Sequence, residues 1–229
     1  MTDEITGKIV VRATALGKIY TDSAGPVIAL GEISLQVDPG EFVAVCGPSG
    51  CGKSTLLLII GLLLSADEGN LELNGQDVDG MSSSSKSSFR ARNIGFVFQD
   101  FHLIPYLNVL ENVMVPTLAR SIDDAAGRAR MLLEEMGLSH RHDHLPSELS
   151  AGERQRTALV RALLLSPKLI LADEPTGNLD RENADAVLSH LANYADGGGA
   201  VIMATHDQDA MNRAGTRLHL NNGLKVSSD

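Results

Sequence analysis

A glycine-rich turn between an apolar strand and an apolar helix constrains the fold of this chain more than any other feature. Residues 41–46 (EFVAVC) form a short apolar run typical of a buried strand, and residues 53–64 follow with the composition of an apolar helix. Residues 47–54 read GPSGCGKS and fit G-x-x-x-x-G-K-[ST] in the strand–turn–helix context that this pattern requires. Backbone N–H groups of such a turn point inward around an anion, and the helix N-terminus adds partial positive charge. We therefore predict a phosphate-binding loop here.

Two side chains at the end of this loop are expected to contact the phosphates and a metal ion. Lys53 should reach the β- and γ-phosphates of a nucleotide, and the Ser54 hydroxyl should ligate Mg²⁺. The residues that we expect to contact the nucleotide in this segment are Gly47, Pro48, Ser49, Gly50, Cys51, Gly52, Lys53, Ser54 and Thr55.

Short apolar runs alternate with helical patterns along most of the remaining chain. Residues 169–172 and 200–204 are again short apolar runs next to helical segments. This alternation indicates an α/β fold with a mostly parallel sheet covered on both faces. Residues 9–16, 28–37 and 69–73 look instead like strands joined by turns, so a small antiparallel sheet is expected there.

A long helical insert separates the early strands from the later ones. Between positions 99 and 149 lie about 50 mostly helical residues, including 123–136, which is far longer than an ordinary crossover in such a sheet. We interpret residues 1–229 as one domain that carries a helical subdomain at roughly 100–160.

Three local patterns lead to further expectations. The serine-rich stretch 81–88 (MSSSSKSS) is expected to be a poorly ordered loop. Residues 222–223 (Asn-Gly) favour a tight hairpin turn. The side chains of His140, His142 and His144 alternate like metal ligands, but a polar loop without a metal is the favoured interpretation.

Composition excludes several classes of protein. The 229 residues carry 29 acidic and 19 basic side chains, and the net charge of −10 argues against a nucleic-acid binder. Cys46 and Cys51 lie too close together for a disulfide framework and fit a reducing compartment. The longest apolar stretch, 56–64, is interrupted by Gly61 and is far shorter than the roughly 20 residues that cross a bilayer. Residues 1–4 lack the plan of a signal peptide, so we expect a cytosolic chain that reaches a membrane only through a partner.

Two adjacent carboxylates end the apolar run 169–172. Asp173 can approach Mg²⁺, and Glu174 is then placed to orient or deprotonate an attacking water. A strand followed by acids is a weak signal alone, because helix N-caps have the same appearance. Together with the phosphate-binding loop it becomes a strong one.

The segment Ser150-Ala151-Gly152-Glu153 has two interpretations. Ser-x-x-Glu is a capping box that starts a helix over 153–165. The same helix N-terminus is also an anion-binding site. The local sequence favours the cap without excluding the anion site.

Six motifs in register resemble the nucleotide-binding subunit of an ATP-binding-cassette (ABC) transporter over essentially the full chain. The sequences DEPTGNLD at 173–180 and GERQR at 152–156 are most similar to those of the macrolide-export and lipoprotein-releasing branch. Cell-division ATPases share much of these two sequences. The resemblance implies a P-loop NTPase core with an antiparallel β subdomain and an inserted helical subdomain. The motifs are the phosphate loop, Gln99 after residues 96–98, residues 149–153, Asp173-Glu174, Asn178-Leu179-Asp180 and His206.

The resemblance also implies a head-to-tail dimer with two ATP molecules and Mg²⁺ at its interface. The phosphate loop of one copy would face Ser150 and Gly152 of the other. Gln99 would sense Mg²⁺ and the water, His206 would bind the γ-phosphate, and Asp180 would link the two sites. By the same resemblance, the aromatic side chain that stacks on adenine is Tyr20.

Two features depart from the family pattern or fall outside it. The family usually has Gly where Ala151 stands, and the added methyl fits only if φ is negative. That departure affects how tightly the ATP-bound dimer closes. Arg154, Arg156 and Arg161 follow on the same helix, and we expect them to pair with nearby acids.

The resemblance implies an ATPase subunit that drives a separate integral membrane permease, for export or extraction of a substrate. Such a subunit would be cytoplasmic and peripheral on the inner face of the cell membrane. The alternative is an ATPase of the cell-division type that moves a membrane regulator of cell-wall enzymes without transport. A soluble cassette of DNA repair or translation is disfavoured, because the chain lacks a long coiled coil and a second cassette.

Overall fold

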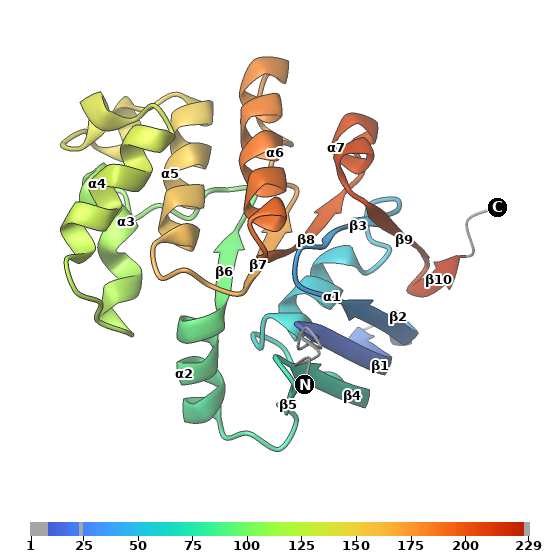
Figure 1. Cartoon of the computed structure of the whole chain (residues 1–229). Helices are drawn as coiled ribbons and strands as arrows, with labels where there is room; N and C mark the ends of the chain where they lie inside the picture. Colours follow the sequence, from blue (N-terminus) through green and yellow to red (C-terminus); the bar gives the residue numbers. More distant parts are fainter. Residues whose placement is uncertain (1–8, 23–24, 227–229) are drawn as a thin grey trace, which may run out of the picture.

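The computed structural model describes residues 9–22 and 25–226, which form two sheets and the helices that pack against them (Figure 1). Five strands of the larger sheet are parallel to their neighbours, and the sixth pairs antiparallel at one edge. This confirms the predicted mostly parallel sheet. Its strands, in spatial order, are β10 (Leu224–Val226), β9 (Thr216–Asn221), β3 (Phe42–Cys46), β8 (Ala200–Thr205), β7 (Leu169–Asp173) and β6 (Ile94–Val97).

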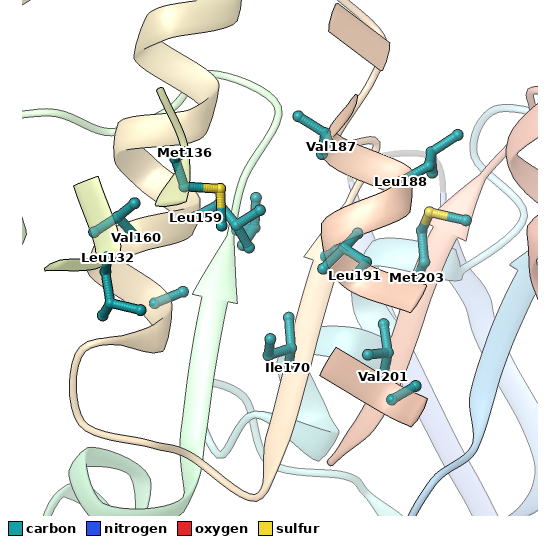
Figure 2. Close-up of a cluster of buried hydrophobic side chains, with 14 of the residues drawn as sticks. Leu132, Met136, Leu159, Val160, Ile170, Val187, Leu188, Leu191, Val201 and Met203 are labelled. Atoms are coloured by element: carbon teal, nitrogen blue, oxygen red, sulfur yellow. The ribbon is translucent and has the colours of Figure 1, made fainter. Parts of the chain in front are cut away.

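Both faces of this sheet are buried. Along β3, Val43 and Val45 belong to one apolar cluster, whereas Ala44 and Cys46 belong to the cluster on the opposite face. Successive side chains of a strand point to opposite faces, so a continuous apolar run serves two cores at once. Figure 2 shows the core that includes Ala44 and Cys46, where α4 (Ala125–Glu135), α5 (Ala151–Leu163) and α6 (Arg181–Asp196) pack over β7 and β8.

The N-terminal strands form a separate antiparallel sheet, as predicted. Its order is β2 (Gly25–Val37), β1 (Val11–Asp22), β4 (Glu68–Leu73) and β5 (Gln76–Asp77). The hairpin of β1 and β2 is longer than the expected strands, with register shifts between Ala13 and Ile19. Its apolar side chains share a core with the helix α1 (Lys53–Ile60).

The insert between β6 and β7 is helical, as expected, and α3, α4 and α5 lie together on one side of the molecule (Figure 1). No helix in the described ranges has the length and hydropathy to span a bilayer. The single-domain organisation over 1–229 and the subdomain bounds stay predictions. The insert comprises α3 (Val109–Met114), η1 (Val115–Leu118), α4 (Ala125–Glu135), η2 (Ser139–Arg141), η3 (Pro146–Glu148) and α5 (Ala151–Leu163), and α6 (Arg181–Asp196) and α7 (Gln208–Arg213) follow later.

The expectation of a poorly ordered serine loop is wrong. Residues from Ser83 onward form the helix α2 (Ser83–Asn93). The Ser82 hydroxyl accepts a hydrogen bond from Ser85 N at 3.2 Å and caps the helix, and Phe89 is buried under it. Serine is a poor helix former but a strong N-cap, and one buried aromatic ring anchors the rest.

Two turns show how glycine limits the elements. The helix α1 ends at Ile60, earlier than expected, and Leu62 adopts a left-handed φ of 58° just beyond it. A side chain at the intervening Gly61 would collide with the ring of Phe96. Between β9 and β10, Asn222 and Gly223 have φ values of 47° and 77°. Two successive positive φ values are typical of a type I′ turn, so the predicted hairpin is confirmed.

Candidate active site

The loop between β3 and α1 wraps its backbone around the ammonium group of Lys53. Nζ of Lys53 donates to the carbonyl oxygens of Gly47 and Pro48 at 2.8 and 3.1 Å. Gly47 and Gly52 have φ of 147° and 103°, and a side chain at either would collide with backbone oxygens of Leu220 or Ala29. The glycines of the motif are therefore required by close backbone approach as well as by φ.

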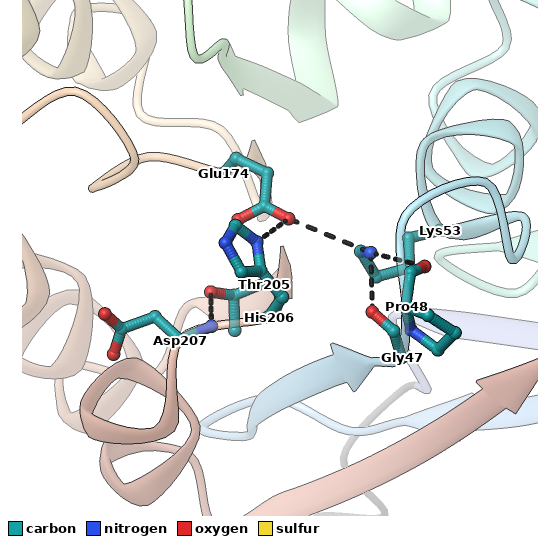
Figure 3. Close-up of polar contacts among 7 residues, drawn as sticks. All are labelled: Gly47, Pro48, Lys53, Glu174, Thr205, His206 and Asp207. Atoms are coloured by element: carbon teal, nitrogen blue, oxygen red, sulfur yellow. Dashed lines mark hydrogen bonds and ion pairs between the residues drawn. The ribbon is translucent and has the colours of Figure 1, made fainter.

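Glu174 lies opposite this loop and joins it to a histidine (Figure 3). Its Oε1 is 2.8 Å from Nδ1 of His206 and 3.8 Å from Nζ of Lys53. Glu174 adopts φ of 45°, and its backbone N donates to the Ala204 carbonyl at 2.9 Å. A non-glycine residue in the left-handed region is uncommon, and here a backbone bond to the adjacent strand holds it.

Asp173, one residue earlier, is in a different environment. Its Oδ1 is buried and has no hydrogen-bond partner among the described residues. Burial raises the pKa of Asp173, the charge of Glu174 raises it further, and a hydrogen bond from Ser54 and the charge of Lys53 oppose the shift. An unpaired carboxylate oxygen beside a hydroxyl supplies the hard oxygen ligands that Mg²⁺ prefers, with phosphate and water left to complete the coordination.

These groups line a cleft of about 700 Å³ that collects most of the predicted nucleotide-contacting residues. Three neighbours in β2 were missed by the sequence: Val27, Ile28 and Ala29. Val27 and Ile28 are consecutive residues of a strand that pairs with β1, and each is more than half exposed, so no alternation of buried and exposed residues marks them as part of a site. The predicted residues in the cleft are Tyr20, Pro48, Ser49, Gly50, Gly52, Lys53, Ser54, Thr55, Gln99, Asp173, Glu174 and His206.

Tyr20 lies at the apolar end of this set. Its ring is 42% exposed, pairs across the hairpin with Val27, and lies 5.9 Å from Nζ of Lys18. A ring left partly exposed with a cation beside it is available for stacking on a flat ligand.

Gly47 and Cys51 belong to the phosphate loop but do not line the cleft. Both thiols of the chain are free and buried, and Cys51 is 2% exposed. Burial raises the pKa of Cys46. The Cys51 side chain is therefore packed beneath the loop and does not face the cleft.

Ser150, Gly152 and Asp180 lie outside the cleft as well. Ser150 and Glu153 form the predicted capping box, with bonds of 3.2 Å to the Ser150 hydroxyl and 2.8 Å to the Glu153 carboxylate. The Asp180 carboxylate caps α6 by accepting from the Asn183 backbone N–H, and hydrogen bonds from Asn183 hold the pKa of Asp180 below the ordinary value.

Ala151, the position of the family departure, is the first residue of α5 and is not among the positive-φ residues. Its methyl group is therefore accommodated without backbone strain.

Gln99 follows β6 and is held through its backbone. Its carbonyl accepts from Nδ2 of Asn178 at 3.2 Å. Shortly after Gln99, Phe101 and His102 have φ of 61° and 47°. Their carbonyls accept hydrogen bonds from Arg161 at 2.7 and 2.6 Å. A guanidinium of α5 thus stabilises two consecutive left-handed residues next to Gln99.

The expectation that the arginines of α5 pair with acids is wrong for the residues that the structure describes. Arg161 binds the two carbonyls above, and Arg156 binds the side-chain oxygen of Asn183 at 2.6 Å. Arg154 lies 5.5 Å from the ring of Phe101 and donates to the Pro146 carbonyl at 3.4 Å. Guanidinium groups satisfy carbonyls and rings as well as carboxylates, so their partners do not follow from nearby acids in the sequence.

The histidines near the end of the insert act through their backbones. The carbonyls of His142 and His144 accept from the N–H groups of Leu110 and Val109. Within the described ranges, no three His, Cys, Asp or Glu side chains are grouped to hold a metal ion.

A second hollow, of about 400 Å³, is more apolar and lies between α2, β6 and the helical insert. Phe98, His102 and Arg161 line it, so it adjoins the segment that follows Gln99. Its apolar lining includes Phe96, Val115, Pro116, Ala119, Ala162 and Leu165.

Comparison with known proteins agrees with this geometry. A Bordetella pertussis protein named lipoprotein-releasing system ATP-binding protein LolD is 44% identical over 216 residues, which cover 93% of this chain and 94% of that protein. LolD 1 of Rhodopirellula baltica is 42% identical over 92% of this chain and 93% of its own length. A solved dimer of the ATP-binding cassette MJ0796, bound to ADP and Pi, superposes with a TM-score of 0.89 at 32% identity, covering 96% of this chain and 98% of that one.

The family assignment follows from these matches. A family model described as ABC transporter matches residues 30–177, a range that begins before the phosphate loop and ends after Glu174. The cassette fold of the solved dimer extends the likeness to nearly the whole chain. The chain belongs to the ABC transporter family and is one of its ATP-binding, ATP-hydrolysing cassettes.

Proposed function

We propose that this chain binds ATP in the cleft above its phosphate loop and uses its hydrolysis to drive a separate integral membrane permease. The observation that carries the proposal is the position of Glu174, whose carboxylate contacts both Lys53 and His206 at the mouth of the loop. Such a carboxylate can take a proton from a water molecule that lies beside a γ-phosphate bound at the loop.

Lys53 is the main charge partner of the phosphates in this proposal. Its ammonium group, 7% exposed, is held by the carbonyls of Gly47 and Pro48. The β- and γ-phosphate oxygens would take over these contacts, while the N–H groups of the loop and the α1 N-terminus bind the same charge. Tyr20 would stack on the adenine, and Thr55 would line the phosphate end.

Ser54, Gln99 and Asp173 are proposed to hold Mg²⁺. The unpaired Oδ1 of Asp173 supports this assignment, because a buried carboxylate oxygen without a partner needs a cation or a donor. When bound, Mg²⁺ neutralises charge on the β- and γ-phosphates.

Hydrolysis in this proposal begins with a water held by Glu174. The carboxylate accepts a proton as the water oxygen bonds to the γ-phosphorus and the bond from that phosphorus to the bridging oxygen breaks. Oε1 of Glu174 is the hydrogen-bond partner of Nδ1 of His206, so the other ring nitrogen, Nε2, can face a γ-phosphate oxygen. ADP and phosphate are the products.

A second copy of the chain is proposed to complete each site. Ser150, Gly152 and Asp180 lie outside the cleft of their own chain, and solved cassettes similar to this one form dimers. In a head-to-tail pair, the capped N-terminus of α5 would face the γ-phosphate held by the other copy.

The permease is proposed to dock in the apolar hollow between α2 and the helical insert. Arg161 and His102 line it, and Arg161 also binds the backbone next to Gln99, so docking and the ATP site share residues. The names of the relatives support export or extraction of a lipoprotein-like substrate from the membrane. The chain would then be cytoplasmic and peripheral on the inner face of the membrane.

The experiment that tests the proposal is Glu174→Gln. Loss of the base should lower the hydrolysis rate by about 10²–10⁴-fold. ATP binding should persist, because Lys53 and the loop are unchanged, and an ATP-bound dimer should accumulate in size-exclusion chromatography. Glu134→Gln, an exposed carboxylate of α4 outside the cleft, is the matched control and should hydrolyse normally. Normal hydrolysis by Glu174→Gln would remove Glu174 from the mechanism.

A further inference from the structure

Asn183, in the first turn of α6, joins the loop that carries Asp180 to the helix α5. Its Nδ2 donates to Oδ1 and Oδ2 of Asp180, at 3.0 and 2.8 Å. Its Oδ1 accepts from Nη1 of Arg156 at 2.6 Å. The Asn183 side-chain amide therefore donates to the loop that carries Asp180 and accepts from the helix α5.

The same amide packs directly on the first turn of α5. A side chain at Gly152 would collide with Oδ1 and Cγ of Asn183. Gly152 and Arg156 are four residues apart and lie on one face of the helix. Asn183 therefore contacts this face of α5 at two residues, Gly152 and Arg156.

Helix capping accounts for only part of this arrangement. Asp180 caps α6 through the backbone N–H of Asn183, at 2.9 Å, and almost any residue at position 183 supplies that donor. The side chain adds the bonds to both Asp180 oxygens and the charge-assisted bond from Arg156. Arg156 makes no ion pair within the described part of the chain, so Asn183 is its main partner.

We propose that Asn183 is a positioning residue that fixes Asp180 relative to Ser150 and Gly152. The two elements would then approach the ATP of the second copy as one unit. Only this last step rests on the proposed function, since the link itself lies within one chain.

The link is tested first without nucleotide, by hydrogen–deuterium exchange. Asn183→Leu keeps the branched shape of the side chain and the backbone N–H but removes all three side-chain hydrogen bonds. Residues 147–153 and 177–183 should both exchange about tenfold faster, the change expected from losing a hydrogen bond to a charged group. The control is Asn193→Leu, an exposed asparagine on the same helix, which should leave both segments unchanged. Faster exchange in 177–183 alone, or in neither segment, would overturn the proposal.

The consequence for assembly is tested in the Glu174→Gln background with ATP and Mg²⁺. Asn183→Leu should weaken dimerisation about tenfold or more, while the affinity for ADP, which one copy binds alone, stays within about twofold because Asn183 lies outside the cleft. Arg156→Met should weaken the dimer too, and the double variant should be no weaker than Asn183→Leu. Unchanged dimerisation, or an equal loss of ADP affinity, contradicts a positioning role.

The two experiments separate the two proposals. If the Glu174→Gln parent itself forms no dimer with ATP, the proposed function is wrong, and the exchange measurement still decides whether Asn183 links the two elements.

Discussion

Asp173 and Glu174 are neighbours in the chain, yet their surroundings give them different chemistry. Glu174 has two cationic or imidazole partners within 4 Å, whereas one oxygen of Asp173 is buried with none. A carboxylate with such partners has its electrostatic contacts within the chain. A carboxylate without them is unfavourable until a cation binds.

This difference predicts that Asp173→Asn stabilises the nucleotide-free chain while it abolishes hydrolysis. The pKa of Asp173 is raised in the folded state, mainly by burial, so folding disfavours its charged form. Stability is therefore lost as pH rises from the ordinary value of 3.8 through the folded pKa. Thermal unfolding should show a higher Tm for the variant at pH 7, about 2–4 °C for each kcal/mol in a domain of this size.

The gain in Tm should shrink as pH falls through the folded pKa and below 3.8, because Asp173 then loses its charge in both the folded and the unfolded state. A variant that is less stable than the parent at pH 7 would show that the Ser54 hydrogen bond outweighs the cost of burial.

At the scale of elements, the N-terminus of α5 has two roles, and Ser150 takes part in both. Its hydroxyl caps the helix, and the same helix end is proposed to face the phosphate of the second copy. Aspartate is as good an N-cap as serine but carries a negative charge. One substitution can therefore separate the two roles.

Ser150→Asp should leave Tm nearly unchanged and prevent the ATP-bound dimer in the Glu174→Gln background. The charge would face a γ-phosphate at short range, where like charges repel strongly. Ser82→Asp, at the N-cap of α2, is the matched control and should dimerise normally. A dimer that forms equally well with Ser150→Asp would leave Ser150 with its capping role alone.

Elements that depend on local pattern could be predicted from the sequence, and those that depend on distant contacts could not. The strands β3, β7 and β8 are continuous apolar runs because both of their faces are buried, and that signal is local. The helix α2 was missed because its capping serine and its buried Phe89 act from either end of a serine tract. Gly61 at the end of α1 is required by the ring of Phe96, which is far away in the chain.

The candidate site divides in the same way. The phosphate loop and the Asp173-Glu174 pair are consecutive residues, so motif spacing identifies them. Ala29 and its neighbours in β2 enter the cleft through tertiary packing, and Asn183 meets Arg156 across 27 positions. No linear pattern marks such residues, because their roles come from the meeting of separate elements.

For the whole molecule, the decisive feature is that the two halves of the proposed site lie apart in one chain. Lys53 and Glu174 share a cleft, and Ser150 lies outside it. A site assembled from two copies can be rescued by mixing two defective chains, provided that the defects fall on different halves. A site contained in one copy cannot.

Mixing Lys53→Ala with Ser150→Asp should therefore restore hydrolysis that neither variant has alone. In the mixed dimer, one site has both defects, and the other combines an intact Lys53 with an intact Ser150. Random pairing makes half of the dimers mixed, each with one of two sites intact, so activity of up to about a quarter of the parent is expected. The rate should rise with total protein concentration in a steady-state ATPase assay, since association precedes catalysis. A mixture no more active than its components would mean that each chain hydrolyses ATP without its partner.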